Sequence, residues 1–514
     1  MARALLIAML LWSAGASAQD LVLDGTLDAD APPYTAVPFT VPEGTVEIEV
    51  RHDDLSEANI LDWGLADPER VRGWGGGNTE PAIVGVETAS RSYLPGPIAA
   101  GEWSVLVGQA LVTEPPTYRI EIFFRTTPTL DAQPDRGPYA TVPALESGPR
   151  WYAGDFHVHS RESGDARATI DESAQLAAEL GLDFIELSEH NTVSQVDYLV
   201  AAQERHPGVL LMPGIEVTTY FGHGNAIGVE SFVDFRVRSD IGVTLETMIT
   251  DTQAVDGIFA INHPVLDLGS LCLGCAWDLD TPEGVDAVEV QNGAYSLTGA
   301  LFYRNAIDFW DSMLDEGQHV AAIGGSDDHR AGIDLDRLQS PIGSPTTMVY
   351  ADELSVAAIV AGVRAGRTVV KLEGADDPMV ELSASDAMVG DTVDGPVTLR
   401  ALVTGADGGR LAFLRNGEIH TQVDVDSDPF EATLDVTAPF GDVDDRWRAQ
   451  LSMPQPRVVT SHIWVRASGE PEPPDAGPGG EDGDGGGCGC RTTSGAGDAW
   501  LGLLVLVCLR RRRP

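Results

Sequence analysis

Lysine is almost absent from this chain. Of its 514 residues only Lys371 is a lysine, arginine supplies the remaining positive charge, and 32 basic residues face 79 acidic ones, which gives a net charge of −47. A surface this acidic repels polyanions, so we expect no nucleic acid or anionic membrane as a partner. No glycine-rich loop is followed by Lys-Ser or Lys-Thr, which argues against a nucleotide-binding P-loop.

Cysteine is also scarce. Three of the five cysteines lie near the C-terminal end, and only Cys272 and Cys275 lie in the globular part of the sequence. A structural zinc site of the Cys-x-x-Cys type normally needs a second pair, which this sequence lacks. In an oxidising compartment the spacing favours a disulfide between Cys272 and Cys275.

Long hydrophobic runs are missing too, and the two ends predict export. Residues 1–18 combine an early Arg3, an apolar run and the small residues Ala16-Ser17-Ala18, as in a secretory signal peptide. At the other end an acidic Gly/Pro-rich linker (469–487) precedes a tail (488–514). The tail contains Cys488-Gly489-Cys490, about ten apolar residues and a terminal run of four arginines at 510–513. The apolar run is too short to span a bilayer, which takes ~20 residues.

The tail resembles the MYXO-CTERM sorting tail of myxobacterial surface proteins. The resemblance implies that the tail is removed and that the protein is left at the cell surface, outer membrane or extracellular space, with anchoring through one of the tail cysteines. A plain weak membrane anchor is the alternative, and the protein is exported under either interpretation.

Between these ends the length and the 43% hydrophobic content suggest about three domains. Residues 19–130 contain short alternating runs separated by Gly, Pro and Asp, which predicts an antiparallel β-sandwich. Residues 131–150 form a Pro-rich linker. Residues 151–374 alternate strand-like and helical stretches, and residues 375–468 return to the alternation expected of an Ig-like β-sandwich.

The middle region predicts a parallel sheet, most simply a barrel. Its seven strand-like runs are expected at 155–158, 183–187, 209–215, 225–229, 257–261, 286–290 and 319–324. Helices are expected at 171–180, 194–205, 245–255, 303–314 and 354–365.

The residues that carry chemistry lie where these strands end. The first strand finishes with His157-Val158-His159, and residues i and i+2 of a strand face the same side, so both imidazoles point into the barrel. Two imidazoles on one face suit a transition metal. Later strand ends bring further ligand-type residues to the same rim: His190, Glu216, His223, His263, Asp327 and His329.

These elements resemble the PHP (polymerase and histidinol phosphatase) metal-dependent hydrolases. The motifs are H-x-H at 157–159, His190-Asn191-Thr192, Gly214-Ile215-Glu216, Asn262-His263-Pro264 and Gly325-Ser326-Asp327-Asp328-His329. Residues 286–293, 344–347 and 364–367 look like the CehA/McbA branch, named for carbaryl hydrolases. The resemblance covers about 220 residues and implies a distorted (β/α)7 barrel that holds two or three divalent ions such as zinc, manganese or iron.

Carried over by position, the resemblance implies three ligand sets. The first ion takes His157, His159, Glu216 and Asp327. Glu216 also bridges to a second ion, held by His223 and His263. The third ion takes His190, His329 and an acid, for which we favour Asp165 over its neighbour Glu162. Glu189 is expected to orient a histidine from outside the ligand set.

Two ions about 3.5–4 Å apart can lower the pKa of a shared water to ~7 and direct a bridging hydroxide at an electrophile. We therefore expect a hydrolase, with Glu216 and Asp327 at the reaction centre and Arg161 and Arg330 as candidate clamps for an anionic small-molecule ester. A phosphoesterase is the first hypothesis and a carboxyl or carbamate ester hydrolase the second. A surface binding protein with a relic barrel is the alternative from another class. The sequence leaves the oligomeric state open.

Overall fold

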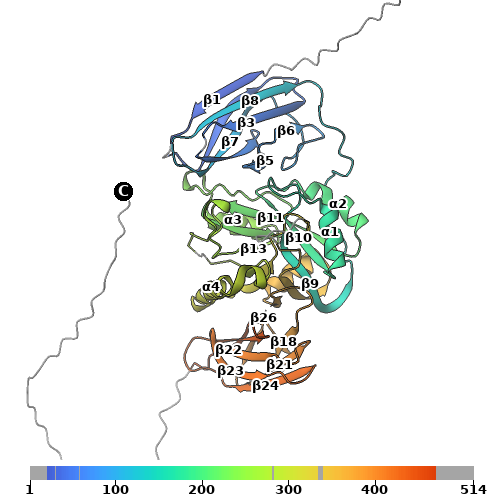
Figure 1. Ribbon diagram of the computed structural model, residues 1–514, viewed down its shortest axis with the longest axis vertical. Helices are drawn as coiled ribbons and strands as arrows, with labels where there is room; N and C mark the ends of the chain where they lie inside the picture. Colours follow the sequence, from blue (N-terminus) through green and yellow to red (C-terminus); the bar gives the residue numbers. More distant parts are fainter. Residues whose placement is uncertain (1–19, 29–30, 57, 281–282, 334–339, 470–514) are drawn as a thin grey trace, which may run out of the picture. The chain divides into compact units, whose positions relative to one another are not determined.

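The computed structural model describes residues 20–28, 31–56, 58–280, 283–333 and 340–469 (Figure 1). These described residues form one compact unit. The expected signal peptide, the expected sorting tail and all but the first residue of the acidic linker lie outside the described residues. Among the residues described, no helix is both long and apolar enough to cross a membrane.

The N-terminal region consists of two four-stranded antiparallel sheets, ordered β1-β8-β3-β6 and β2-β7-β4-β5. Inward-facing residues of both sheets, such as Ile48 and Trp103, share one apolar core. That arrangement is the one expected from period-two alternation. The strands are β1 (Leu21–Thr26), β2 (Tyr34–Val41), β3 (Glu47–Asp54), β4 (Ile60–Ala66), β5 (Val71–Gly76), β6 (Ala82–Gly85), β7 (Gly101–Leu111) and β8 (Thr117–Arg125).

The central region is a sheet in which seven strands neighbour one another in chain order, from β9 to β15. All seven strand-like runs and all five helical stretches expected from the sequence overlap these elements. The strands are β9 (Ser147–Val158), β10 (Phe184–His190), β11 (Leu210–Thr219), β12 (Gly222–Ile227), β13 (Ile258–Ile261), β14 (Ala287–Asn292) and β15 (Ala321–Gly325). The helices are α1 (Ile170–Glu179), α2 (Val196–Arg205), α3 (Leu245–Gln253), α4 (Tyr295–Asp315) and α5 (Val356–Arg364).

Regular (β/α)7 alternation is not present, which corrects the simplest expectation. Strand β12 pairs antiparallel with both β11 and β13, because a tight hairpin at Tyr220 and Phe221 replaces a crossover helix. Between β13 and β14 the described chain has only the short 3₁₀ turn η2 (Gly269–Leu271). A second 3₁₀ turn, η1 (Ser239–Ile241), precedes α3.

The first and last strands of this set meet just beyond the end of β15. The amide of His159 donates to the carbonyl of Asp328, and the amide of Asp327 donates to the carbonyl of His157, each at 2.9 Å. The buried carboxylate of Asp155 links the same two strand ends, because it accepts hydrogen bonds from the amides of His157, Ser326 and Gly343. The strand ends that carry the expected ligands are therefore brought onto one rim.

The helices are positioned by local signals in the sequence. Helix α1 begins at a capping box in which Thr169 and Glu172 exchange hydrogen bonds. Its buried face follows a spacing of three and four residues, through Ile170, Ala174 and Ala177. The apolar beginning of β10 is buried throughout, as expected for a strand covered on both faces.

The C-terminal region shares its sheet with the central one. Strands β16 (Thr346–Glu353) and β17 (Thr368–Lys371) extend the central sheet from β9, and β17 pairs with β26 across the boundary expected at residue 374. A separate sheet, β19-β18-β21-β24, shares a core with these strands. The strands are β18 (Met379–Ala384), β19 (Ala387–Met388), β20 (Thr392–Asp394), β21 (Val397–Thr404), β22 (Arg410–Arg415), β23 (Glu418–Asp424), β24 (Phe430–Val436), β25 (Asp445–Ser452), β26 (Pro456–Thr460) and β27 (Ile463–Arg466).

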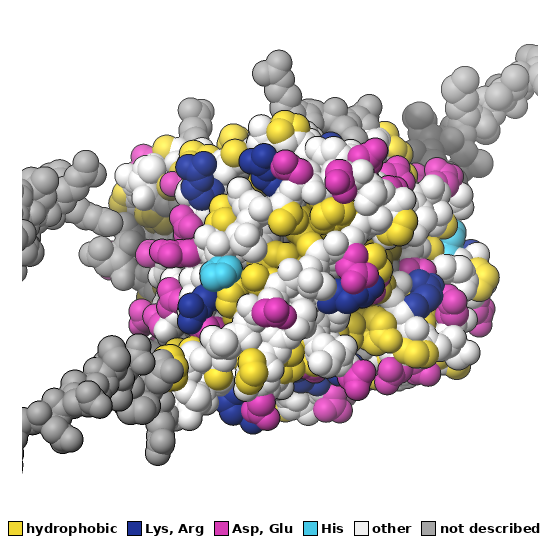
Figure 2. All heavy atoms as spheres, turned by 90° about the horizontal axis from the view of Figure 1, so that it is seen from below, with side chains coloured by type: hydrophobic (Ala, Val, Ile, Leu, Met, Phe, Trp, Pro, Cys, Tyr) yellow, Lys and Arg dark blue, Asp and Glu magenta, His cyan; other side chains and the backbone are white. Residues whose placement is uncertain are grey.

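The surface carries the acidic charge expected from composition. On the face drawn in Figure 2, acidic side chains are spread over much of the surface and arginines lie among them. A charge distribution of this kind favours solubility and disfavours polyanionic partners.

Candidate metal centre

Side chains from the strand ends converge at the rim of the central sheet. His157 on β9 and His159, which directly follows that strand, are both fully buried. His190 ends β10, Glu216 lies on β11, and His223 lies at the start of β12, which brings it to the same rim because that strand is antiparallel. The loops after β13 and β15 add His263, Asp327 and His329.

The first expected ligand set is assembled at coordination spacing. His157 Nε2 lies 3.4 Å from both Glu216 Oε1 and Asp327 Oδ1. His159 Nε2 lies 3.2 Å from Asp327 Oδ1 and 3.7 Å from Glu216 Oε2. Ligands about 2.0–2.2 Å from one zinc-like ion are separated by such distances, so the four side chains can share a cation.

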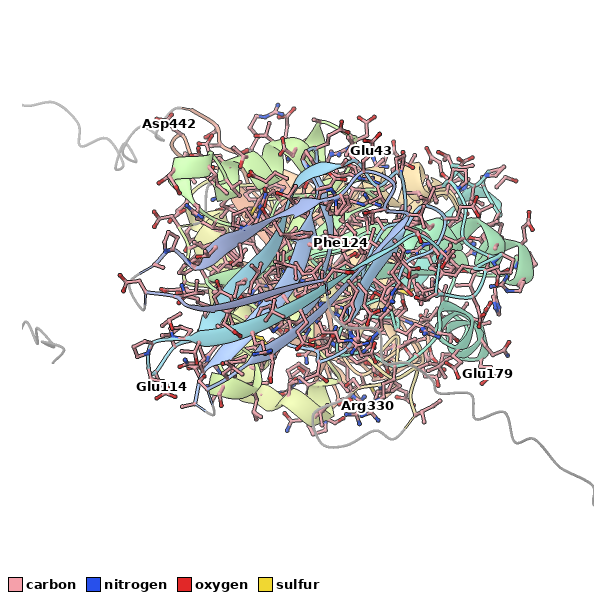
Figure 3. The ribbon with its side chains drawn as sticks, turned by 90° about the horizontal axis from the view of Figure 1, so that it is seen from above. Glu43, Glu114, Phe124, Glu179, Arg330 and Asp442 are labelled. Carbon is pink, nitrogen blue, oxygen red and sulfur yellow. A yellow bond between two sulfur atoms is a disulfide. The ribbon has the colours of Figure 1, made fainter. Side chains whose placement is uncertain are left out.

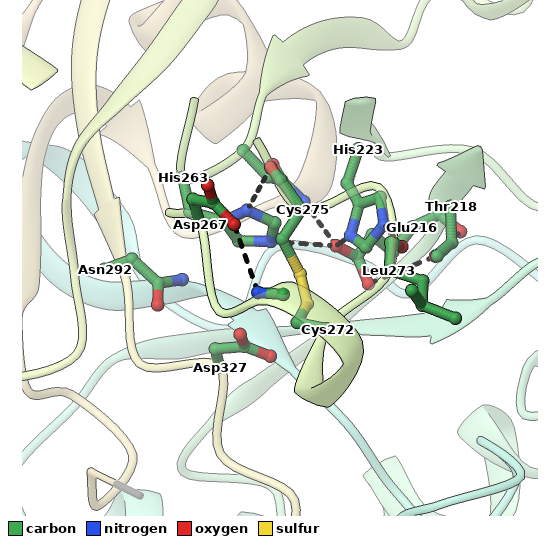
Figure 4. Close-up of a disulfide and its surroundings, with 12 residues drawn as sticks. Glu216, Thr218, His223, His263, Asp267, Cys272, Leu273, Cys275, Asn292 and Asp327 are labelled. Carbon is green, nitrogen blue, oxygen red and sulfur yellow. Dashed lines mark hydrogen bonds and ion pairs between the residues drawn. A yellow bond between two sulfur atoms is a disulfide. The ribbon is translucent and has the colours of Figure 1, made fainter. Parts of the chain in front are cut away.

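Glu216 is the common member of two ligand sets. Its Oε1 lies 3.3 Å from His223 Nδ1 and 3.4 Å from His263 Nε2. Figure 4 shows the carboxylate between these two imidazoles, beside the disulfide. Because the same carboxylate also faces His157 and His159, it is placed to bridge two ions.

The third expected set is a nearly equilateral triangle. Asp165 Oδ2 lies 3.4 Å from His190 Nε2 and 3.5 Å from His329 Nε2, and the two imidazole nitrogens are 3.3 Å apart. Glu162, the alternative acid, is buried elsewhere, because its Oε2 accepts from the amide of Ser92 and the hydroxyl of Ser194. The geometry therefore favours Asp165 for this set.

Two buried ring nitrogens show which kind of group fits the site. His157 Nε2 and His159 Nε2 are buried and have no hydrogen-bond partner, although each lies among carboxylate oxygens. A buried polar atom without a partner costs free energy, and a neutral imidazole nitrogen is a preferred transition-metal ligand. The residues present fit a divalent ion at this position.

The opposite nitrogen of each histidine is held by the protein, as metal-binding imidazoles usually are. For His157 the partner is a carboxylate, at 2.8 Å from Nδ1 to Glu289 Oε1, and for His159 it is the Ser163 hydroxyl at 3.0 Å. The remaining contacts are His190 with Thr218, His223 with the carbonyl of Leu273, His263 with the carbonyl of Cys275, and His329 with the carbonyl of Asp327.

The backbone at the rim is also unusual. Asn191, His263 and Asp327 have φ angles of 53°, 27° and 56°, in the left-handed region that side chains other than glycine rarely adopt. Such conformations persist only where the surrounding structure enforces them, and they gather at functional sites. Each of these residues immediately follows a ligand or is itself one.

The charges of the cluster shift its pKa values in opposite directions. Burial, with the neighbouring His329 and His190, lowers the pKa of His159 to about 3, so this imidazole is neutral and can offer a lone pair. Burial alone would raise the pKa of Glu216, but His157 and His190 outweigh it and hold that pKa well below its usual value. Burial lowers the pKa of His157 and of His190. The neighbouring carboxylates outweigh burial, so both pKa values are raised.

The ligands open into a cavity of about 540 Å³, and only one of the two expected arginine clamps lines it. Arg330 lies on the loop after β15 and lines this cavity; Figure 3 labels it near the edge of the view. Arg161 lines a different cavity, of about 700 Å³. Beyond the end of β9 the amide of Arg161 turns to the carbonyl of Ala168, so strand alternation no longer sets the direction of its side chain.

Glu189 forms no hydrogen bond with a histidine among the described residues, so its link to the ligand set is indirect. Its carboxylate accepts from the amide and hydroxyl of Ser160, and it reaches His159 only through Ser163. The direct role belongs to Glu289 on β14. Asn262 donates to Glu216 Oε1 at 3.1 Å. The sequence assigned no role to Glu289 or Asn262, although Asn262 stands beside His263 in the Asn-His-Pro element.

The cysteine pair agrees with the sequence interpretation. Cys272 and Cys275 form the expected disulfide. The other five histidines have packing roles: His52 stacks on Trp63, His206 pairs with Asp171, His319 stacks on Trp464, His420 meets Trp447, and His462 is buried against Trp310.

Comparison with protein-family models finds no match, and comparison with curated proteins finds none either. Among solved structures, the chain is similar to a two-domain protein from Bacteroides vulgatus described as containing a predicted PHP-like metal-dependent phosphoesterase. Identity is 19%, the TM-score is 0.36, and the match covers 65% of this chain and 100% of that one.

A putative metal-dependent phosphoesterase from Bifidobacterium adolescentis is 15% identical with a TM-score of 0.25, covering 35% of this chain and 89% of that one. A calcium-binding mutant of β-glucuronidase 2 from Bacteroides uniformis is 13% identical with a TM-score of 0.19, covering 87% and 61% of the two chains. These overall scores are low, so the ligand geometry is the basis for the function below.

Proposed function

We propose that this chain is an exported PHP-type hydrolase that uses two or three divalent transition-metal ions to cleave a phosphoester. The observation that carries the proposal is the pair of buried, unpartnered nitrogens of His157 and His159, facing the bridging carboxylate of Glu216. Divalent ions bound there supply Lewis acidity toward a phosphoryl or carbonyl oxygen and lower the pKa of water.

The protein's own residues then have separable tasks. Glu216 and Asp327 balance the cationic charge, and Glu289 and Ser163 hold the imidazoles of His157 and His159 in the orientation that presents Nε2. Arg330 lines the cavity and supplies a guanidinium for an anionic ester. In a protein with a net charge of −47, cations at the site are needed to make the local field attractive to a phosphate.

A carboxyl or carbamate ester is the second candidate. It is supported by the apolar part of the cavity wall, where Leu266, Leu297 and Phe302 lie close to the ligands. Such a wall suits an uncharged ester with an apolar substituent. The CehA/McbA resemblance of the sequence points the same way.

The decisive experiment is metal analysis together with a substrate panel. We expect the purified full chain to bind two or three ions of zinc, manganese or iron, and to hydrolyse nitrophenyl phosphate, a nitrophenyl phosphodiester or an acyl ester in a metal-dependent manner. The ester class that is turned over separates the two candidates. Less than one bound ion per chain would contradict both and favour a non-catalytic surface binding protein.

A further inference from the structure

The ligand cluster lies between two cavities. One is the cavity of about 540 Å³ that contains Arg330, and the other has a volume of about 490 Å³. Asp165, His190 and His223 line both, as do Leu271 and Cys272 from the disulfide loop. A group held at the ligands therefore has space on two sides.

The first cavity has an apolar wall, which we call the leucine arm and define by Leu266, Leu268, Leu297 and Phe302. Leu271, at the junction of the two cavities, is 76% exposed. Apolar side chains at the mouth of a pocket gain most when a ligand covers them. The leucine arm therefore suits an alkyl, acyl or aryl group.

The second cavity has a wall contributed by the N-terminal β-sandwich, which we call the sandwich arm. It is formed by Asp62 on β4, Trp74 on β5 and the glycine-rich segment 75–78. Two contacts fix this wall against the loop that carries Asp165. A Cβ atom on Gly164 would lie 2.2 Å from the carbonyl oxygen of Gly75, so the two backbones touch, and Arg91 donates to the carbonyls of Gly164 and Ala166.

Asp62 is the one ionisable residue of this wall. Its Oδ2 accepts from the hydroxyl of Tyr220 at 2.7 Å. Within the described parts of the chain, Oδ1 receives no hydrogen bond, and neither an arginine nor the lysine forms an ion pair with the carboxylate. Burial raises the pKa of Asp62 to about 6, against the bond from Tyr220, which lowers it. A carboxylate that is ionised at neutral pH and forms no ion pair with an arginine or lysine can accept a hydrogen bond from a ligand.

We propose that the substrate is an ester with two unlike halves, and that Asp62 selects one of them. An apolar group lies in the leucine arm, an alcohol with hydroxyl or ammonium donors lies in the sandwich arm, and the ester bond lies at the ligands between them. Hydrolysis adds water across that bond: the hydroxyl joins phosphorus or carbon, and the proton joins the departing oxygen. This inference rests on the proposed function and makes the N-terminal sandwich a specificity element.

The test compares two nitrophenyl phosphodiesters that differ only in their second alcohol, ethanol or ethanolamine, with the metal-loaded full chain. A charge-assisted hydrogen bond to Asp62 should make kcat/KM about 10- to 100-fold higher for the ethanolamine diester. Asp62→Ala should bring this ratio close to one, and Asp62→Asn should retain part of it. Asp53→Ala, at an exposed acid of the same sandwich, should leave both rates unchanged.

Metal content measured on the same samples keeps the outcomes distinct. If wild-type protein cleaves both diesters equally, or if Asp62→Ala lowers both rates by the same factor, the inference is wrong and the proposed function stands. The same protein is also assayed with two carboxylate esters, an acetate and an aminoethyl ester. If metal-loaded protein cleaves neither the diesters nor these carboxylate esters, both the proposed function and the inference fail.

The leucine arm has a matching test. Lengthening the apolar group of the ester should raise kcat/KM by roughly three- to fourfold per added methylene until the arm is filled. Leu297→Ser should flatten that dependence without reducing the preference for ethanolamine. A chain-length dependence that Leu297→Ser leaves intact would place the apolar group elsewhere.

Discussion

Two regions of the molecule bury histidine next to charged side chains, and they differ in how the charge is balanced. One is the rim cluster, formed by the three ligand sets at the rim of the central sheet. The other, which we call the arginine seam, consists of Asp311 on α4 with Arg446, Arg448 and His462 near β25. In the seam both guanidinium groups contact the Asp311 carboxylate, at 3.3 and 2.6 Å. His462 Nε2 lies 3.3 Å from Arg448.

The comparison shows that burial alone does not identify a ligand. His462 is buried, as His157 and His159 are, but its ring faces Trp310 and Arg448. Burial and the two arginines hold its pKa well below 6.5. At the rim His157 and His159 face several carboxylate oxygens, yet their Nε2 atoms have no partner. The seam is balanced by two guanidinium groups, whereas the rim offers buried imidazole nitrogens and carboxylates that fit a cation.

The largest expected effect is the loss of the bridging carboxylate. In Glu216→Gln an amide replaces the one group that faces His157, His159, His223 and His263, and an amide cannot balance two cations. We expect metal affinity to fall by more than the roughly 10- to 100-fold that follows loss of an outer-shell partner. Elemental analysis of the dialysed protein should show fewer ions per chain, and hydrolysis should be lost.

Glu47→Gln is the matched control for this experiment. Glu47 is also a fully buried carboxylate, but it accepts from Thr129 in the N-terminal sandwich. That variant should keep the wild-type metal content. Equal metal content in Glu216→Gln and wild-type protein would show that the protein's own groups balance the charges of the rim, as they do in the arginine seam.

The next effect concerns the seam. Asp311→Ala leaves Arg448, whose side chain is 1% exposed, without the carboxylate that it contacts. Breaking a buried ion pair by removing one partner typically costs about 3–5 kcal/mol of unfolding free energy. Denaturant unfolding should show that loss while metal content stays unchanged. A loss of metal without a loss of stability would reverse the roles assigned to the two regions.

The sequence predicts the rim better than its surroundings, for a physical reason. His157 and His159 were predictable because strand alternation decides the direction of their side chains. Arg161 was not, because the chain turns just beyond the strand. The choice between Glu162 and Asp165 also depends on that turn and on Ser92, a residue 70 positions away. Asp62 contacts Tyr220 across 158 positions, and no local pattern signals such a pairing.

A smaller effect is expected outside the ligand set. Glu289 fixes His157 through Nδ1 and also accepts from the amide of His263, so it acts on two of the ligand sets. Glu289→Gln should weaken metal binding by about 10- to 100-fold with little change in the fold. Competition with a chelator of known affinity measures this. Glu189→Gln should have a smaller effect, because Glu189 reaches His159 only through Ser163; the opposite order would restore the role first expected for Glu189.

The last effect is a dependence of metal binding on pH, which only the rim should show. In the metal-free protein burial lowers the pKa of His329, but Asp165 and Asp327 outweigh it and raise the pKa to about 9. A protonated imidazole cannot bind a metal, so the metal must displace the His329 proton below pH 9. Metal affinity should therefore fall about tenfold for each pH unit below 9. His462, already neutral, adds nothing in this range.

The same shift affects stability with a definite sign. A histidine with a raised pKa in the folded state stabilises the metal-free protein fully below its unfolded pKa, about 6.5, and this contribution is lost as the pH rises toward 9. The metal-free protein should therefore lose stability over the same pH interval in which metal affinity rises. The difference in melting temperature between zinc-loaded and chelator-treated protein should widen from pH 6.5 to pH 9. A constant or narrowing difference would mean that protons and metal do not compete for His329, and that the third ligand set is balanced by the protein as the arginine seam is.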